Sequence, residues 1–183
     1  MQPASNAAKY TLTEHRHRFA VWAAARAAQR GWTSTERLAA ALEASGASAL
    51  VRGSPTNWPA TAGAFDAAQR EWAHALLDHL AASGVHGTYG RAAKLLAIYL
   101  KATIVLAGHA DSPFGRVLHP PLDSILLRNL AADTRFPAAR RSLWRQTSWT
   151  RLDEQRYFEL IDTLRATRLD QPAFWMVERY WQP

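Results

Sequence analysis

The segment GVHGTYGRAAKLLAIYLKATIVLAG, residues 84–108, constrains the fold of this chain most strongly. After its glycine-rich start, apolar residues occupy nearly every side of a helix that begins near Thr88 or Gly90 and ends by Gly108. A helix that is apolar all round is typical of the buried centre of a protein. Lys94 and Lys101, two of the three lysines in the chain, lie seven positions apart and therefore share one face of this helix. The two charges also argue against a membrane span.

Glycine, proline and capping residues divide the rest of the chain into further helices, and no alternating polar and apolar run argues for a sheet. Thr11 with Glu14, and Thr33 with Glu36, have the spacing of a capping box. The sequence predicts these helices at residues 11–30, 33–46, 65–82, 121–131, 137–146, 153–168 and 172–181, with a loop at 52–63. We therefore expect an all-α fold, and a chain of 183 residues is long enough for one domain, residues 1–183, with a real core.

The charge of the chain indicates a polyanionic partner. The net charge is +7, and a basic surface gains free energy when it releases counterions from phosphates. An arginine-rich genomic composition would give the same global figure, so local clustering is more informative. Six arginines and one acid, Asp133, lie between Arg128 and Arg151, with two tryptophans among them. Arginines bind phosphate and aromatic rings stack on bases, which predicts a DNA-binding face that includes Arg140, Arg141 and Arg145. The alternative is that the tryptophans belong to the core.

Several classes of site and location are excluded or disfavoured. The chain has no cysteine, which excludes disulfides, zinc–thiolate sites and cysteine-ligated clusters. The histidines follow no recognised ligand spacing, so we expect neither a metal nor another cofactor. The first 20 residues lack an apolar run followed by a small-residue cleavage site, which favours a cytoplasmic protein without a signal sequence.

The two lysines of the central helix have two interpretations. In one, the aliphatic stem lies along apolar surface while the ammonium group reaches solvent or a carboxylate. In the other, partial burial lowers the pKa of the amine, so that a fraction of it is neutral and nucleophilic near pH 7.

The second unusual stretch is HPPLDSILLRNL, residues 119–130. Its two prolines predict an extended approach and a helix start, which would place Asp123 in the first turn of the helix. An acid at that position interacts favourably with the helix dipole. The same residue also presents a single carboxylate in apolar surroundings.

These features together resemble the core of the helix-hairpin-helix DNA glycosylases. The shared pattern is a glycine-rich hairpin, an apolar helix with a lysine, a loop, and Pro-Leu-Asp before another apolar helix, and it covers residues 84–130. It is most similar to the archaeal 8-oxoguanine type, in which a second lysine also follows seven residues after the first. Bacterial antiviral glycosylases that remove bulky modified bases from phage DNA are similar as well. The usual Leu-Pro-Gly-Val-Gly hairpin is replaced here by GVHGTYG, and 29 residues separate Lys94 from Asp123.

The resemblance implies a function and a set of site residues. Asp123 would be the general catalytic carboxylate and Lys94 the nucleophile of a bifunctional enzyme with lyase activity, or a phosphate contact if water attacks instead. The partner would be double-stranded DNA with one flipped nucleotide, bound by a monomer without a membrane. The residues expected to bind DNA are Gly87, Thr88, Tyr89, Gly90, Arg91, Lys101 and the three arginines named above. The candidates for a base pocket or wedge are Trp58, Tyr99, His119 and Trp149.

Two other classes of function fit the same sequence. A helical DNA-binding regulator would use the hairpin on phosphate and keep Lys94, Lys101 and Asp123 as structural residues. A scaffold of helices that binds another protein would show little salt-dependent binding to DNA.

Overall fold

The computed structural model describes residues 10–167, 169 and 172–183, and that part of the chain is helical without a strand. The expected all-α class is therefore confirmed. The α-helices are α1 (Leu12–Gln29), α2 (Thr35–Ala44), α3 (Ala47–Arg52), α4 (Ala62–Ala82), α5 (Tyr89–Leu100), α6 (Pro113–Val117), α7 (Ser124–Ala132), α8 (Ala138–Gln146) and α9 (Glu154–Arg165). The other helical segments are η1 (Pro55–Asn57), the π-helix η2 (Lys101–His109), η3 (Trp149–Arg151) and η4 (Phe174–Tyr180).

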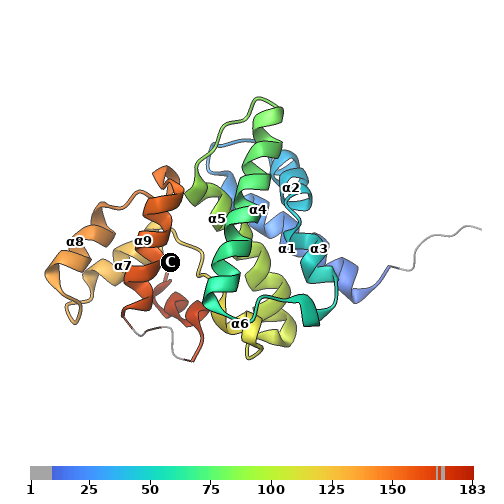
Figure 1. The fold of residues 1–183 in the computed structure, drawn as a ribbon. Helices are drawn as coiled ribbons and strands as arrows, with labels where there is room; N and C mark the ends of the chain where they lie inside the picture. The colour runs from blue at the N-terminus through green and yellow to red at the C-terminus, as the bar shows by residue number, and fades with distance from the viewer. Residues whose placement is uncertain (1–9, 168, 170–171) are drawn as a thin grey trace, which may run out of the picture.

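Helix α5 lies at the centre of the molecule. It contacts α1, α4 and α9, and η3 as well (Figure 1). Nearly all of its residues are buried, as the apolar pattern predicts. Helices α7, α8 and α9 lie together on one side of it and α1 to α3 on the other (Figure 1). One cluster of buried apolar residues extends from Ala20 to Val177 and joins both groups.

Length and composition alone would allow residues Tyr89–His109 to cross a membrane. However, 56% of the most apolar window of this segment is buried inside the protein. The core helix of a folded domain passes the same test, so this feature is weak evidence for a membrane span.

The predicted helix starts agree with some of the side-chain caps in the structure and differ from others. The Thr11 hydroxyl accepts a hydrogen bond from the backbone N–H of Glu14, as expected of a capping residue. The second cap is Ser34 rather than Thr33, because the Ser34 hydroxyl accepts from the N–H of Arg37. Helix α4 begins at Ala62, three residues before the predicted start, since Thr61 caps it. The predicted end of the next-to-last helix, Arg168, lies outside the described residues.

The central helix does not continue as an α-helix to Gly108. It changes to a π-helix at Lys101 and ends at Gly108, whose φ is 93°. The Thr103 hydroxyl donates a hydrogen bond of 2.8 Å to the carbonyl of Tyr99. In a regular α-helix, that carbonyl accepts a hydrogen bond from the backbone N–H of Thr103, so the hydroxyl competes with the backbone for it. The π-helix therefore starts where a side chain competes for the backbone carbonyl, and such bulges are frequent at functional sites.

Candidate active site

Lys94 and Asp123 are in direct contact inside the protein. The Lys94 Nζ atom donates a hydrogen bond of 3.2 Å to Asp123 Oδ2, and the two side chains are 5% and 11% exposed. Lys94 comes from α5 and Asp123 from the residue before α7. The fold therefore places side by side the two residues that the sequence singled out for catalysis, while their chemical role stays a prediction.

Asp123 is the N-cap of α7 and not a residue of its first turn, which corrects the sequence-based placement. Its Oδ1 atom accepts hydrogen bonds of 3.0 Å from the backbone N–H groups of Ile125 and Leu126. The two preceding prolines form extended, buried backbone, so the helix starts three residues later than Pro121. Because the cap uses Oδ1, the carboxylate is fixed with Oδ2 toward Lys94.

The surroundings of the pair come from parts of the chain that sequence reasoning did not connect. The Lys94 Nζ atom lies 4.3 Å from the ring centre of Trp149, which is a cation–π distance. The Trp181 indole N–H donates a hydrogen bond of 3.0 Å to Asp123 Oδ2. The pair therefore has one aromatic neighbour from η3 and one from the C-terminal segment.

A second pair, Lys101 with Glu178, continues this cluster. Lys101 donates a hydrogen bond to Glu178 Oε2 across the contact between η2 and η4. The other oxygen of Glu178, Oε1, is buried and has no hydrogen-bond partner in the described part of the chain. The sequence analysis missed both Glu178 and Trp181. The available signal was a glutamate within the aromatic run FWMVERYW, residues 174–181.

Burial makes the lysine a better nucleophile than it would be in water. Desolvation lowers the pKa of Lys94, and the contact with Asp123 only partly offsets this. The positive charges of Arg30 and Lys101 lower it further. A larger fraction of the amine is therefore neutral near pH 7 than for a lysine at the surface.

The two acids of the cluster shift in opposite directions. Burial by itself raises the pKa of Asp123, but hydrogen bonds from the Leu126 backbone and Trp181, together with the charge and hydrogen bond of Lys94, lower it overall. Desolvation raises the pKa of Glu178, and Lys101 does not fully compensate. The cluster thus combines an acid that stays ionised with one that holds a proton more readily. Acids and bases at catalytic sites often show such a separation.

Packing explains two of the three glycines of the GVHGTYG segment, Gly87 and Gly90, whereas Gly84 has open space around it and a φ of 75°. A Cβ atom on Gly87 would lie 2.1 Å from the Trp32 ring, and one on Gly90 would lie 2.1 Å from the Trp149 carbonyl oxygen. The Gly90 N–H donates to the Leu152 carbonyl, and the Thr88 hydroxyl donates to the Thr150 carbonyl. The Gly90 N–H therefore already has a partner in this structure and would have to exchange it to bind phosphate.

Three more residues of the expected DNA surface are buried or in contact with other side chains of the protein. Tyr89 is 4% exposed, and desolvation raises the pKa of its buried hydroxyl. The Arg91 guanidinium lies 5.7 Å from the ring centre of Trp32. Lys101 is engaged by Glu178. Tyr89 is consequently a core residue, and the two cations would have to exchange their partners to bind phosphate.

The arginine-rich stretch does form a basic groove, next to Asp123. A cavity of about 410 Å³ between α7 and α8 is lined by Arg128 and Arg145, and by Ser124, the residue after Asp123. The Arg145 side chain is exposed and donates to the Ala131 carbonyl at 3.4 Å. Arg140 and Arg141 lie on α8 and do not line this groove. Trp144 and Trp149 are buried, as the alternative interpretation of the tryptophans expected.

The remaining base-pocket candidates lie away from the pair. His119 is buried and interacts with Asp66 and Tyr157 at 2.9 and 3.0 Å, so both of its ring nitrogens are engaged away from Asp123. Trp58 and Tyr99 line another cavity, with His17. Of the four candidates, only Trp149 contacts Lys94, and at 7% exposed it is a wall of the site rather than a wedge.

Comparisons with protein-family models, with curated proteins and with solved structures give no match to this chain. In the part of the chain that the structure describes, no group of three or more histidine and acidic side chains is arranged to hold a metal ion.

Proposed function

We propose that this protein is a DNA glycosylase of the helix-hairpin-helix type, which cleaves the N-glycosidic bond of a flipped-out modified or damaged base. The observation that carries the proposal is the buried contact of 3.2 Å between Lys94 and Asp123, in which the lysine pKa and the aspartate pKa are both lowered. A more neutral amine beside an ionised carboxylate is what this bond cleavage requires. The base is an 8-oxoguanine-type lesion, or a bulky modified cytosine of phage DNA.

Asp123 would stabilise the charge that develops on the sugar. The transition state of glycosidic cleavage resembles an oxocarbenium ion, and a fixed carboxylate next to C1′ stabilises it. The two backbone N–H groups that bind Oδ1 hold the carboxylate in one orientation. Oδ2 remains the oxygen that faces the reacting atoms.

Lys94 would supply the nucleophile. Its neutral amine attacks C1′ as the bond from C1′ to the base nitrogen breaks, and the base leaves with that electron pair and takes up a proton. Loss of a proton from the new amine and opening of the sugar ring give a Schiff base. β-Elimination of the 3′-phosphate then cleaves the strand. If water attacks instead, the product is an intact abasic site.

The polar groups around the pair suit recognition of a base. Lys101 and Glu178 lie in the same cluster, and the free Oε1 atom of Glu178 is an acceptor or, when protonated, a donor. Trp181 contacts Asp123 and is 43% exposed, so the C-terminal segment covers the pair and presents an aromatic ring to the outside. This segment must move for a nucleotide to enter. The basic groove of Arg128 and Arg145 would bind the DNA backbone beside it.

The proposal is tested by a search for free base released from DNA. Duplexes with 8-oxoguanine, uracil or alkylated bases, and phage DNA with hydroxymethylated or glucosylated cytosine, are incubated with wild type and Lys94→Gln. Mass spectrometry identifies the base. If Lys94 is the nucleophile, borohydride should trap a covalent adduct with wild type and none with Lys94→Gln. An adduct of equal yield with Lys94→Gln would contradict this assignment.

A non-enzymatic DNA-binding protein is the second candidate. It is favoured by the packing role of both hairpin glycines and by the fact that Lys94 and Asp123 already satisfy one another. In that case no base is released from any substrate, and the protein prefers one duplex sequence.

A further inference from the structure

A small cavity of about 230 Å³ lies where α1, the end of α3, η1 and the start of η2 meet. Thr13, Arg16 and His17 of α1 form one wall, and Trp58, Tyr99 and His109 belong to the others. The cavity is smaller than typical drug-sized sites, so a ligand must be small. It lies on a different face of α5 from the candidate active site, because Tyr99 follows Lys94 by five residues, about 140° around the helix.

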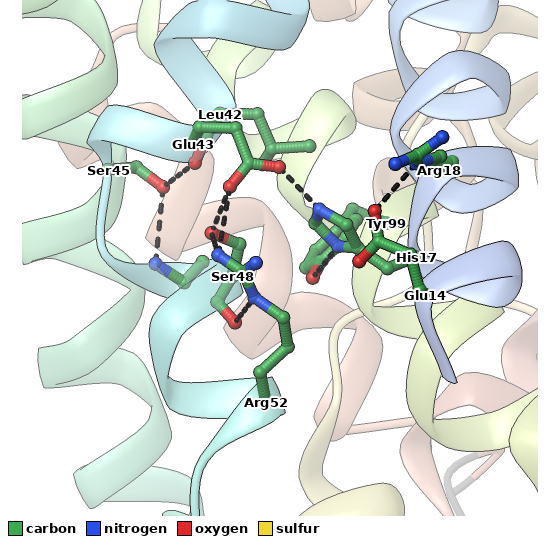
Figure 2. A network of polar contacts seen from close by, with 10 residues as sticks. Glu14, His17, Arg18, Leu42, Glu43, Ser45, Ser48, Arg52 and Tyr99 are labelled. Atoms are coloured by element: carbon green, nitrogen blue, oxygen red, sulfur yellow. Dashed lines mark hydrogen bonds and ion pairs between the residues drawn. The ribbon is translucent and has the colours of Figure 1, made fainter. Parts of the chain in front are cut away.

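The inner wall of the cavity is held rigidly by a network of polar contacts (Figure 2). His17 Nδ1 lies 3.1 Å from the Tyr99 hydroxyl, and its Nε2 lies 2.6 Å from Glu43 Oε1. Glu43 Oε2 accepts hydrogen bonds from Ser48 at 2.7 Å and from Arg52 at 3.2 Å. The network thus fixes the positions of His17, Tyr99 and Arg52, all of which line the cavity.

Two donors that face the cavity are uncommitted. The side chains of Arg16 and His109 line it, and the structure gives neither a hydrogen bond nor an ion pair with any described residue. His109 only packs edge-on against the Trp58 ring, at 5.2 Å between ring centres. The lining residues include two arginines and two histidines but no carboxylate, and Glu43 lies behind them. The cavity is therefore suited to an anion.

Trp58 supplies an aromatic part of the cavity lining, and the rings of His109 and Phe114 pack against it. The Trp58 indole is held in place by a hydrogen bond of 3.3 Å from its N–H to the Leu50 carbonyl and by the edge of His109. Bases stack on aromatic rings of this kind in proteins that bind single-stranded nucleic acid. Arginine binds phosphate through paired, charge-assisted hydrogen bonds. The Trp58 ring and the Arg16 side chain line the same small cavity.

We propose that this cavity binds a nucleoside monophosphate group, with the phosphate at Arg16 and His109 and the base against Trp58. The same chemistry is presented by a free mononucleotide and by the 5′-phosphorylated end of a nucleic-acid strand. The site is separate from Lys94 and Asp123, so it stands or falls independently of the proposed glycosylase activity.

Calorimetric titration of the full chain with AMP, adenosine, inorganic phosphate and a 5′-phosphorylated pentanucleotide tests the proposal. AMP is expected to bind more tightly than phosphate or adenosine alone. If the pentanucleotide binds more tightly than AMP, the natural ligand is the 5′-phosphorylated end of a strand. If AMP binds more tightly, the natural ligand is a free mononucleotide. Arg16→Gln should weaken binding at least about tenfold. Arg26→Gln, an exposed arginine of the same helix outside the cavity, should leave it unchanged.

Three results would overturn the proposal. They are the absence of AMP and pentanucleotide binding up to about 1 mM, equal affinities for AMP and inorganic phosphate, and wild-type AMP affinity in Arg16→Gln. If Arg16→Gln does not fold, His109→Gln replaces it, because that side chain is exposed and has no role in the core. Release of base by the protein serves as a separate readout and should not change in either variant.

Discussion

Two clusters of buried charge in the described part of the chain differ in how completely their polar atoms are used. In the first, Arg165 donates two hydrogen bonds to Asp66, at 2.8 and 2.7 Å, while His119 bridges Asp66 and Tyr157. In the second, Lys94 has one hydrogen bond, to Asp123, among the described residues, and a carboxylate oxygen of Glu178 has none.

The pKa shifts follow this difference. Despite burial, hydrogen bonds and charges from Arg165 and His119 hold the pKa of Asp66 far below its usual value. Desolvation lowers the pKa of His119 in the first cluster and of Lys94 in the second. Only in the second does it also raise the pKa of an acid, Glu178, while the pKa of Asp123 is lowered. A cluster in which every polar atom has a hydrogen-bond partner stabilises the fold. A cluster with unpaired polar atoms keeps donors, acceptors and a nucleophile available for a ligand. The comparison is the reason to regard the second cluster as the functional one.

The largest difference is expected in stability. Asp66→Asn removes the carboxylate that accepts two hydrogen bonds from the partly buried Arg165 and leaves Arg165 only the exposed Asp162 at 3.5 Å, which should cost about 3–5 kcal/mol in the free energy of unfolding. Asp123→Asn should cost about 2 kcal/mol or less, because asparagine is also a good N-cap and Lys94 can lose its proton. Urea unfolding of both variants checks this order. Equal losses, or a larger loss at Asp123, would mean that both clusters are structural.

A smaller effect is expected on DNA binding. Arg128→Gln and Arg145→Gln should each weaken binding to a duplex and reduce the slope of log affinity against log salt by about one. Arg37→Gln, an exposed arginine on α2, is the matched control and should change neither quantity. If all three variants behave alike, the groove between α7 and α8 is not the DNA surface.

A third effect is the pH dependence of stability, and its sign differs between the clusters. The pKa of Asp66 is lowered in the folded protein, so its contribution to stability is present above its usual value of 3.8 and is lost as the pH falls below it. The pKa of Glu178 is raised above 4.5, so the folded protein binds more protons there and loses stability as the pH rises from about 4.5 toward the folded-state pKa.

Unfolding curves of wild type, Asp66→Asn and Glu178→Gln measure these two trends. The advantage of wild type over Asp66→Asn should shrink below pH 3.8, and wild type should lose stability relative to Glu178→Gln as the pH rises above 4.5. Parallel curves for all three proteins would show that neither acid has the assigned shift.

Local signals in the sequence predicted the helices well because capping is a local interaction. Thr11 is such a case, since its cap involves a residue only three positions away. The start of α7 was predicted too early, because the two prolines form an extended approach and Asp123 supplies the cap. The change to a π-helix at Lys101 has no counterpart in the hydrophobic pattern of the sequence.

The candidate site was predicted only in part, because most of its contacts join distant residues. Lys94 and Asp123 stood out as charges in apolar segments. Trp181 contacts Asp123 from 58 positions away, and Glu178 contacts Lys101 from 77 positions away. Nothing in the local sequence connects these pairs. Conversely, the hairpin glycines suggested phosphate binding, while their contacts show that close packing requires them.

The most direct test of the account compares base release by wild type and Asp123→Asn on the substrate panel described above. The variant must be shown to fold and to bind DNA. The account predicts that wild type releases one modified base and that Asp123→Asn does so about 10²- to 10⁴-fold more slowly with DNA affinity unchanged. Equal rates, or no release by folded, DNA-binding wild type from any substrate, would contradict it and return Lys94 and Asp123 to a structural role.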